Sequence, residues 1–194
     1  MAASAAFAHT TDTLIYTSTP TVGSGVTSTS GDIRTVPFNS RAGGTSTPIA
    51  GAATTAYNAY YPTFSPDDQL VAYNRVSDGA SSYNNAAAEV FVIPAAGGSP
   101  ARIAANDPPA CSGKTSPGVT NSWPKWAPGS TVLAGKTVYW LTFSSTRTGN
   151  PQLYVTPILF DGTTISTFPA LYLWNQPAAE NNHTPAWDDF GILQ

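Results

Sequence analysis

The chain has 194 residues and a net charge of −3, and 10% of its residues are charged, 41% hydrophobic and 11% aromatic. So much apolar and aromatic surface argues against a disordered chain, and the lack of a basic stripe argues against nucleic acid as a partner. The 17 prolines and 16 glycines disfavour long helices and predict many short strands joined by turns.

The composition disfavours further classes of protein. No apolar run approaches the roughly 20 residues that cross a bilayer. Cys111 is the only cysteine, so the sequence contains neither an internal disulfide nor a cluster of thiolate metal ligands. We interpret Cys111 as an incidental loop cysteine, because nothing in the sequence places a histidine beside it. The low charge and the many Thr, Asn and Tyr residues are typical of exported bacterial proteins, so we expect a periplasmic, cell-surface or secreted location.

The first 50 residues predict three strands, at 14–17, 32–37 and 47–49, where β-branched and aromatic residues alternate with turn residues. Residues 1–8 are mainly alanine and lack the basic start of a complete signal peptide. We assign no strand to them, so the first strand of this unit is expected to be missing.

The segment 60–105 predicts four strands, and the first of them carries Pro62 and Phe64. Proline is tolerated on an edge strand, and the aromatic residue two positions later points to the same face. We expect Phe64 to fill the space between neighbouring sheets, where a large ring contributes most. Three apolar runs follow, at 70–74, 89–94 and 101–104.

The segment 122–175 repeats this order, with Pro124 and Trp126 at the start and apolar runs at 137–142, 152–157 and 170–174. The motif begins once more at Pro185 and Trp187.

The spacing of these motifs indicates a repeat. From Pro62 to Pro124 is 62 positions, and from Pro124 to Pro185 is 61. Similarity at a nearly fixed period is the signature of a repeat architecture, and four strands per unit are typical of a β-propeller blade.

The expected fold is therefore an all-β propeller of four-stranded antiparallel blades, in a single domain over residues 1–194. About three blades are expected in the chain. The first takes its strands from 14–50 and is closed by 183–189, the second is 60–105, and the third is 122–175.

The run Tyr61-Pro62-Thr63-Phe64-Ser65-Pro66-Asp67-Asp68, followed by the apolar strand 70–73, resembles the repeat of TolB-like β-propellers. That repeat has a proline, an aromatic residue, Ser-Pro-Asp-Gly and then an apolar strand. The resemblance covers nearly the whole chain, but the unit at Trp126 lacks the Asp and the unit at Trp187 lacks Ser-Pro. It implies the propeller fold of an exported bacterial protein.

Three blades do not close a ring, because common propellers have about four to eight. We expect either that the chain is part of a larger propeller or that two copies form a six-bladed ring. In the second case, residues 185–188 of one copy would lie beside 14–17 of the other.

No catalytic pattern is found: the sequence has no Gly-x-Ser-x-Gly elbow, no Walker loop and no His-Glu-x-x-His. We therefore expect a protein without enzymatic activity or cofactor. The adjacent carboxylates Asp67, Asp68, Asp188 and Asp189 are weak Ca²⁺ candidates. Asp also favours turns by bonding to its own backbone, and this is the preferred interpretation, so no metal is expected.

The loops before the three first strands should share one mouth of a propeller channel. Each carries an asparagine and a flat side chain, and amides beside stacking faces suit a sugar or a peptide. The alternative is that the asparagines stabilise turns and the rings pack between blades. His183 departs from the repeat and is the strongest single functional candidate. The tentative ligand-binding residues are Asn58, Tyr60, Asn121, Trp123, Asn182 and His183.

The function expected from the sequence is a non-catalytic binding or scaffold module for a protein or a glycan, or for self-assembly. The alternatives are a propeller fragment of a larger exported enzyme and a self-associating structural subunit.

Overall fold

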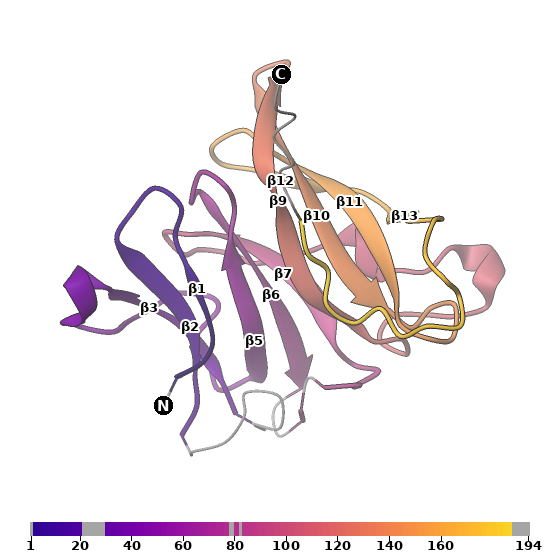
Figure 1. Ribbon diagram of the computed structural model, residues 1–194, viewed down its shortest axis with the longest axis horizontal. Helices are drawn as coiled ribbons and strands as arrows, with labels where there is room; N and C mark the ends of the chain where they lie inside the picture. The colour runs from indigo at the N-terminus through magenta and orange to yellow at the C-terminus, as the bar shows by residue number, and fades with distance from the viewer. Residues whose placement is uncertain (1, 21–29, 78–79, 82, 188–194) are drawn as a thin grey trace.

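The computed structural model describes residues 2–20, 30–77, 80–81 and 83–187. These residues form three antiparallel sheets that lie side by side in chain order (Figure 1). We call them the first, middle and third sheets. The all-β class predicted from the sequence is confirmed, and the sheets remain open.

In the first two sheets, each strand lies beside the next one along the chain. The first sheet contains β1 (Ala2–Phe7), β2 (Thr13–Ser18), β3 (Asp32–Pro37) and β4 (Thr47–Pro48). The middle sheet contains β5 (Tyr57–Phe64), β6 (Leu70–Ser77), β7 (Glu89–Pro94) and β8 (Ala101–Arg102).

The third sheet is larger and contains β9 (Asn121–Leu133), β10 (Lys136–Ser145), β11 (Gln152–Phe160) and β12 (Ile165–Thr167), with β13 (Leu171–Tyr172) also paired to β11. Short 3-10 turns η1 (Asn39–Arg41), η2 (Ala104–Asn106) and η3 (Ala110–Ser112) lie in the loops. No helix in the described part of the chain is long and apolar enough to cross a membrane.

The middle sheet is buried on both faces, which explains why its strands read as nearly continuous apolar runs. One face packs against the first sheet through side chains such as Ile15, Ile33 and Tyr73. The other packs against the third sheet through side chains such as Leu70 and Leu141. Burial of this apolar area is the main force that holds the three sheets together.

The first strand of each sheet contains the same irregularity. Ser4 in β1, Tyr61 in β5 and Trp123 in β9 have positive φ angles of 50°, 50° and 58°. The register shifts at the same places, so each strand carries a β-bulge. Left-handed backbone is unfavourable for residues with a Cβ, and unusual for bulky ones. A bulge with positive φ at three corresponding positions is therefore a recurring structural feature of the first strands.

The third strand of each sheet begins with a common hydrogen bond. The N–H of Ile49, Ile103 and Leu173 donates to the carbonyl of Ile33, Val90 and Leu153, at 3.0, 3.3 and 3.2 Å respectively. In the middle and third sheets, a side-chain amide three residues further on, Asn106 or Gln176, also pairs with the main chain of Val90 or Leu153.

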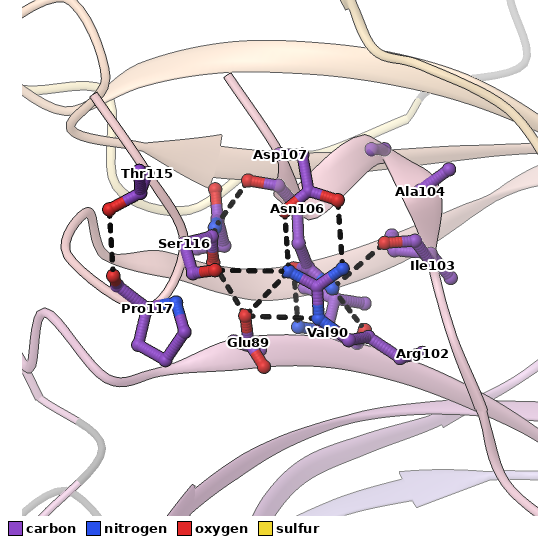
Figure 2. A network of polar contacts seen from close by, with 12 residues as sticks. Glu89, Val90, Arg102, Ile103, Ala104, Asn106, Asp107, Thr115, Ser116 and Pro117 are labelled. Atoms are coloured by element: carbon purple, nitrogen blue, oxygen red, sulfur yellow. Dashed lines mark hydrogen bonds and ion pairs between the residues drawn. The ribbon is translucent and has the colours of Figure 1, made fainter. Parts of the chain in front are cut away.

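A polar network joins the middle sheet to the loop that leads to β9 (Figure 2). Arg102 donates to Glu89 Oε1 at 3.1 and 2.7 Å and to the two oxygens of Asp107 at 2.9 and 2.7 Å. These bonds, led by those to Asp107, raise the pKa of Arg102 and outweigh the effect of burial, while the guanidinium lowers the pKa of Asp107. Ser116 Oγ donates to the same Glu89 oxygen at 2.6 Å and fixes the loop.

The expectation that residues 183–189 close the first sheet is wrong for their described part. β1 occupies the edge of β2, with Ala3 opposite Thr17 and Phe7 opposite Leu14. Residues 183–187 form no strand and lie beside the third sheet, where Trp187 Nε1 donates to Thr142 Oγ1 at 2.9 Å. The reason is chain entropy, because closing the short loop between β1 and β2 costs far less than joining the two ends of the chain.

This correction also removes the expected exchange of strands between copies. Residues 185–188 of a second copy cannot pair with residues 14–17, because β1 already occupies that edge.

Candidate ligand-binding groove

The three predicted asparagines bind their own chain. Asn58 Nδ2 donates to the carbonyl of Ala80 at 2.7 Å, and Asn121 Nδ2 donates to that of Asn106 at 3.0 Å. Asn182 Nδ2 donates to Gln176 Oε1 at 3.2 Å. Asn58 and Asn121 are fully buried. This geometry favours the turn-stabilising interpretation of the asparagines over a direct role at a ligand.

The three predicted flat side chains differ from one another. Tyr60 is fully buried and its hydroxyl donates to the carbonyl of Ala80 at 2.9 Å. Trp123 stacks on Tyr61, with ring centroids 3.9 Å apart and 14° between the planes. His183 stacks on the exposed Tyr83, with centroids 6.2 Å apart. The structure thus brings Trp123 and His183 to one small recess but leaves Tyr60 out of it.

The main concavity lies where the first strands of the three sheets meet residues 184–187. Two adjoining pockets of about 140 and 540 Å³ share Ala6, Lys125 and Thr184 in their walls, and we call them together the axial groove. The narrower pocket is lined by Ser4, Ala5, Ala6, Tyr61, Pro62, Trp123, Pro124, Lys125 and Thr184. The wider one is lined by Ala6, Phe7, His9, Thr63, Phe64, Lys125, Trp126, Ala127, Pro128, Thr184, Pro185, Ala186 and Trp187.

The six predicted repeat residues all lie in the wall of this groove. Pro62 and Pro124 line the narrower pocket, and Phe64, Trp126, Pro185 and Trp187 line the wider one. Phe64 and Trp126 are only 5% and 7% exposed, so they mainly fill the junctions between sheets, whereas Trp187 is 41% exposed.

The wall of the groove is apolar apart from a few hydroxyls, His9 and one cation. Lys125 lines both pockets, and it belongs to none of the ion pairs found among the described residues. The lining contains no Asp, Glu or Cys. The groove can therefore hold apolar or flat groups and attract an anion, but its wall offers no carboxylate for acid–base chemistry or for metal binding.

Sequence reasoning missed the contribution of the N-terminal strand, which supplies Ser4, Ala6 and Phe7. One signal for this strand was available in the sequence. Phe7 stands seven positions before Leu14, which is close to the six positions between Phe64 and Leu70. The alanine-rich context and the absence of proline concealed it. Lys125, inside the Pro-Lys-Trp motif, was also missed as a site residue.

Asp67 and Asp68 connect the middle sheet to both of its neighbours. Asp67 Oδ2 accepts a hydrogen bond from Tyr139 in the third sheet at 2.7 Å. The Asp68 oxygens accept from the main-chain N–H of His9 and of Thr10 at 2.8 and 2.7 Å. The carboxylate oxygens of Asp67 and Asp68 thus accept hydrogen bonds from groups of the protein itself. No group of metal-ligating residues occurs in the described part of the chain. Asp188 and Asp189 lie outside the described residues.

The Asp68 contact makes stability depend on pH. Burial raises the pKa of this carboxyl, but the hydrogen bonds from His9 and Thr10 outweigh burial and hold the pKa below its ordinary value of 3.8. The stabilisation is therefore complete above the unfolded-state pKa and is lost as the pH falls through the lower folded-state value.

We expect Asp68→Asn to be less stable than the wild type near neutral pH and to lose less of its stability between about pH 4 and pH 2. Urea unfolding midpoints measured across this range test the expectation. Asp12→Asn, the same change in the turn between β1 and β2, is the control. A difference between wild type and Asp68→Asn that stays constant down to low pH would contradict it.

No protein-family model, curated protein or solved structure matches this chain.

Proposed function

We propose that the chain is an arc of β-propeller blades and acts as a non-catalytic module that binds a protein or a glycan in the axial groove. Three corresponding bulges, at Ser4, Tyr61 and Trp123, support the repeat. The first strands also lie in sequence around one groove, as the innermost strands of blades lie around a propeller axis.

The proposal includes a relationship to TolB-like propellers and an exported location. The Ser-Pro-Asp turn between β5 and β6 supports the proposed relationship. Ser65 Oγ donates to Asp67 Oδ1 at 2.8 Å and accepts from the N–H of Leu70 at 2.9 Å. The residues that carry the resemblance therefore have a clear physical role in ending one strand and starting the next.

The observation that carries the binding function is the convergence of distant segments on one wall. Residues from β1, β5, β9 and the 184–187 segment line the groove together. Apolar side chains with a stacked Tyr61–Trp123 pair and the cation of Lys125 suit a ligand that combines flat or apolar groups with polar ones. The absence of a carboxylate in this wall favours binding over hydrolysis.

A variant that fills the groove tests this proposal. Thr184 is exposed and lines both pockets, so Thr184→Trp should occupy the space with a bulky ring. Glycan arrays and a displayed peptide library identify ligands of the wild type. We expect the affinity of Thr184→Trp for them to fall by about tenfold or more, which corresponds to a loss of about 1.4 kcal/mol of binding free energy.

Thr45→Trp is the control, because Thr45 is also exposed but does not line the groove. Equal binding by both tryptophan variants would reject the groove as the site. Hits confined to the glycans, or to the peptides, decide the class of partner.

A second candidate function is head-to-tail self-association, favoured by the two outer sheet faces. In the third sheet, Trp140 is 41% exposed and pairs with Pro157 as Leu70 pairs with Pro94 in the middle sheet. Leu70 is buried against the third sheet. In the first sheet, Leu14, Tyr16 and Val36 line an open pocket of about 370 Å³. If the blades repeat, these two faces match each other as the faces of adjacent sheets do within the chain.

A mixing experiment distinguishes this mode. We expect the wild type to associate with rising concentration, and Trp140→Asp and Val36→Asp each to remain monomeric in light scattering. Because each variant keeps the face that the other has lost, an equal mixture should form dimers with one intact interface. A mixture that stays monomeric would contradict head-to-tail packing.

A further inference from the structure

A second pocket lies away from the axial groove, at the opposite end of β5. It has a volume of about 220 Å³ and is lined by residues of the middle sheet and by Pro117 of the following loop. Arg75 and Glu89 are the two charged residues in its wall. They are direct cross-strand partners in the pairing of β6 with β7.

Opposite charges at such positions commonly attract each other, yet these two form no ion pair among those found in the described residues. Arg75 is held between two rings, with its guanidinium carbon 3.4 Å from the centre of the Tyr57 ring and 4.2 Å from that of Phe91. Glu89 is held by Arg102 and Ser116, which both donate to its Oε1. Each charge is thus fixed apart from the other.

The rings that hold Arg75 are themselves fixed. The Tyr57 hydroxyl donates to the carbonyl of Gly51 at 2.6 Å, and Phe91 is 9% exposed within the core between the first and middle sheets. Rings cover the flat faces of a guanidinium, whereas its fork of N–H donors lies along its edge. That edge matches the two oxygens of a carboxylate.

Only one of the two Glu89 carboxylate oxygens accepts hydrogen bonds from described residues. Its Oε1 accepts three hydrogen bonds, whereas no described residue donates one to its Oε2. Glu89 Oε2 can therefore accept hydrogen bonds from an ammonium group. The guanidinium of Arg75, which forms no ion pair with a described residue, lies in the wall of the same pocket.

From this arrangement we propose that the pocket binds a small zwitterion, namely a free α-amino acid. Its carboxylate pairs with the edge of Arg75, and its ammonium group pairs with Glu89 Oε2. The volume fits one such molecule, and the apolar contacts of Ala87 and Pro117 are available to its side chain. This site is independent of the groove and of the function proposed for it.

The probes are the standard L-amino acids, each with its N-acetyl and its C-terminal amide derivative. They are titrated into the ¹⁵N-labelled protein to about 10 mM, above the millimolar Kd expected of such small ligands. We expect saturable amide shifts around residues 75–77 and 89–91 for at least one free amino acid. Both derivatives should bind at least about tenfold more weakly, because each lacks one charged partner.

Arg75→Leu should abolish binding while its stem still packs on the two rings, and Arg75→Lys should retain only part because it loses the planar fork. Arg41→Leu, at an exposed arginine outside the pocket, is the control. Absence of saturable shifts with all the free amino acids would overturn the proposal. So would derivatives that bind as tightly as the parent, or unchanged binding by Arg75→Leu.

Discussion

Replacing Trp126 with alanine is expected to lower the free energy of unfolding by about 3–5 kcal/mol. The side chain is 7% exposed and packs edge-on against Tyr139, with ring centroids 5.6 Å apart. Its Nε1 donates to the carbonyl of Thr63 in the middle sheet at 3.0 Å. Removing it leaves a cavity at the junction of two sheets and takes a hydrogen-bond donor from the Thr63 carbonyl.

Trp187 provides the matched control, since it occupies the corresponding place in the last copy of the motif. It is 41% exposed and its Nε1 donates to the Thr142 hydroxyl at 2.9 Å. We expect Trp187→Ala to cost no more than about 1–2 kcal/mol, because water replaces much of what is lost. Both values come from urea unfolding followed by circular dichroism.

Similar losses of unfolding free energy in the two variants would show that the tryptophan contributes the same energy whether it is buried between two sheets or partly exposed. In that case Trp126 would not act as a packing element between sheets. Trp126→Phe refines the result, because it keeps the ring and removes only the hydrogen bond to Thr63. Its expected cost is about 1 kcal/mol.

The strand pattern could be predicted because apolar runs and turn residues report local preferences. Runs such as 70–74 and 89–94 are apolar on both faces, and the structure buries them between two sheets. Pro62 and Pro124 correctly marked the first strands β5 and β9. Pro185 lines the same groove as these two prolines but lies in no strand. β1 was missed because alanine and serine carry little strand preference, and its position depends on the tertiary edge that β2 offers.

The candidate sites were harder to predict for a different reason. Asn58 and Asn121 were singled out by type, but an amide serves a turn and a ligand equally well, and only the partners of its atoms distinguish the two roles. The pair Arg75 and Glu89 gave no sequence signal. They became candidates only from their contacts with other strands, in which Arg75 stacks on Tyr57 and Glu89 accepts from Arg102.

The next largest expected effect concerns the side-chain amide that completes the third strand of the middle sheet. Asn106 is fully buried, accepts from the N–H of Val90 at 2.8 Å and donates to its carbonyl at 2.8 Å. It also donates to the carbonyl of Ile103 at 3.0 Å. Asn106→Leu keeps the approximate volume, leaves the buried N–H of Val90 without its acceptor and takes one of two donors from the carbonyls of Val90 and Ile103. We therefore expect a loss of about 2–4 kcal/mol.

Gln176 makes the same contacts in the third sheet but is only partly buried, which separates the effect of burial from that of hydrogen bonding. It accepts from the N–H of Leu153 at 2.7 Å and donates to its carbonyl at 2.8 Å. Water can reach these groups when the amide is removed, so Gln176→Leu should cost about 1 kcal/mol. Urea unfolding of the two variants measures the difference. Equal losses would mean that the amide pairing itself, and not the exclusion of water around Asn106, sets the energy at this position.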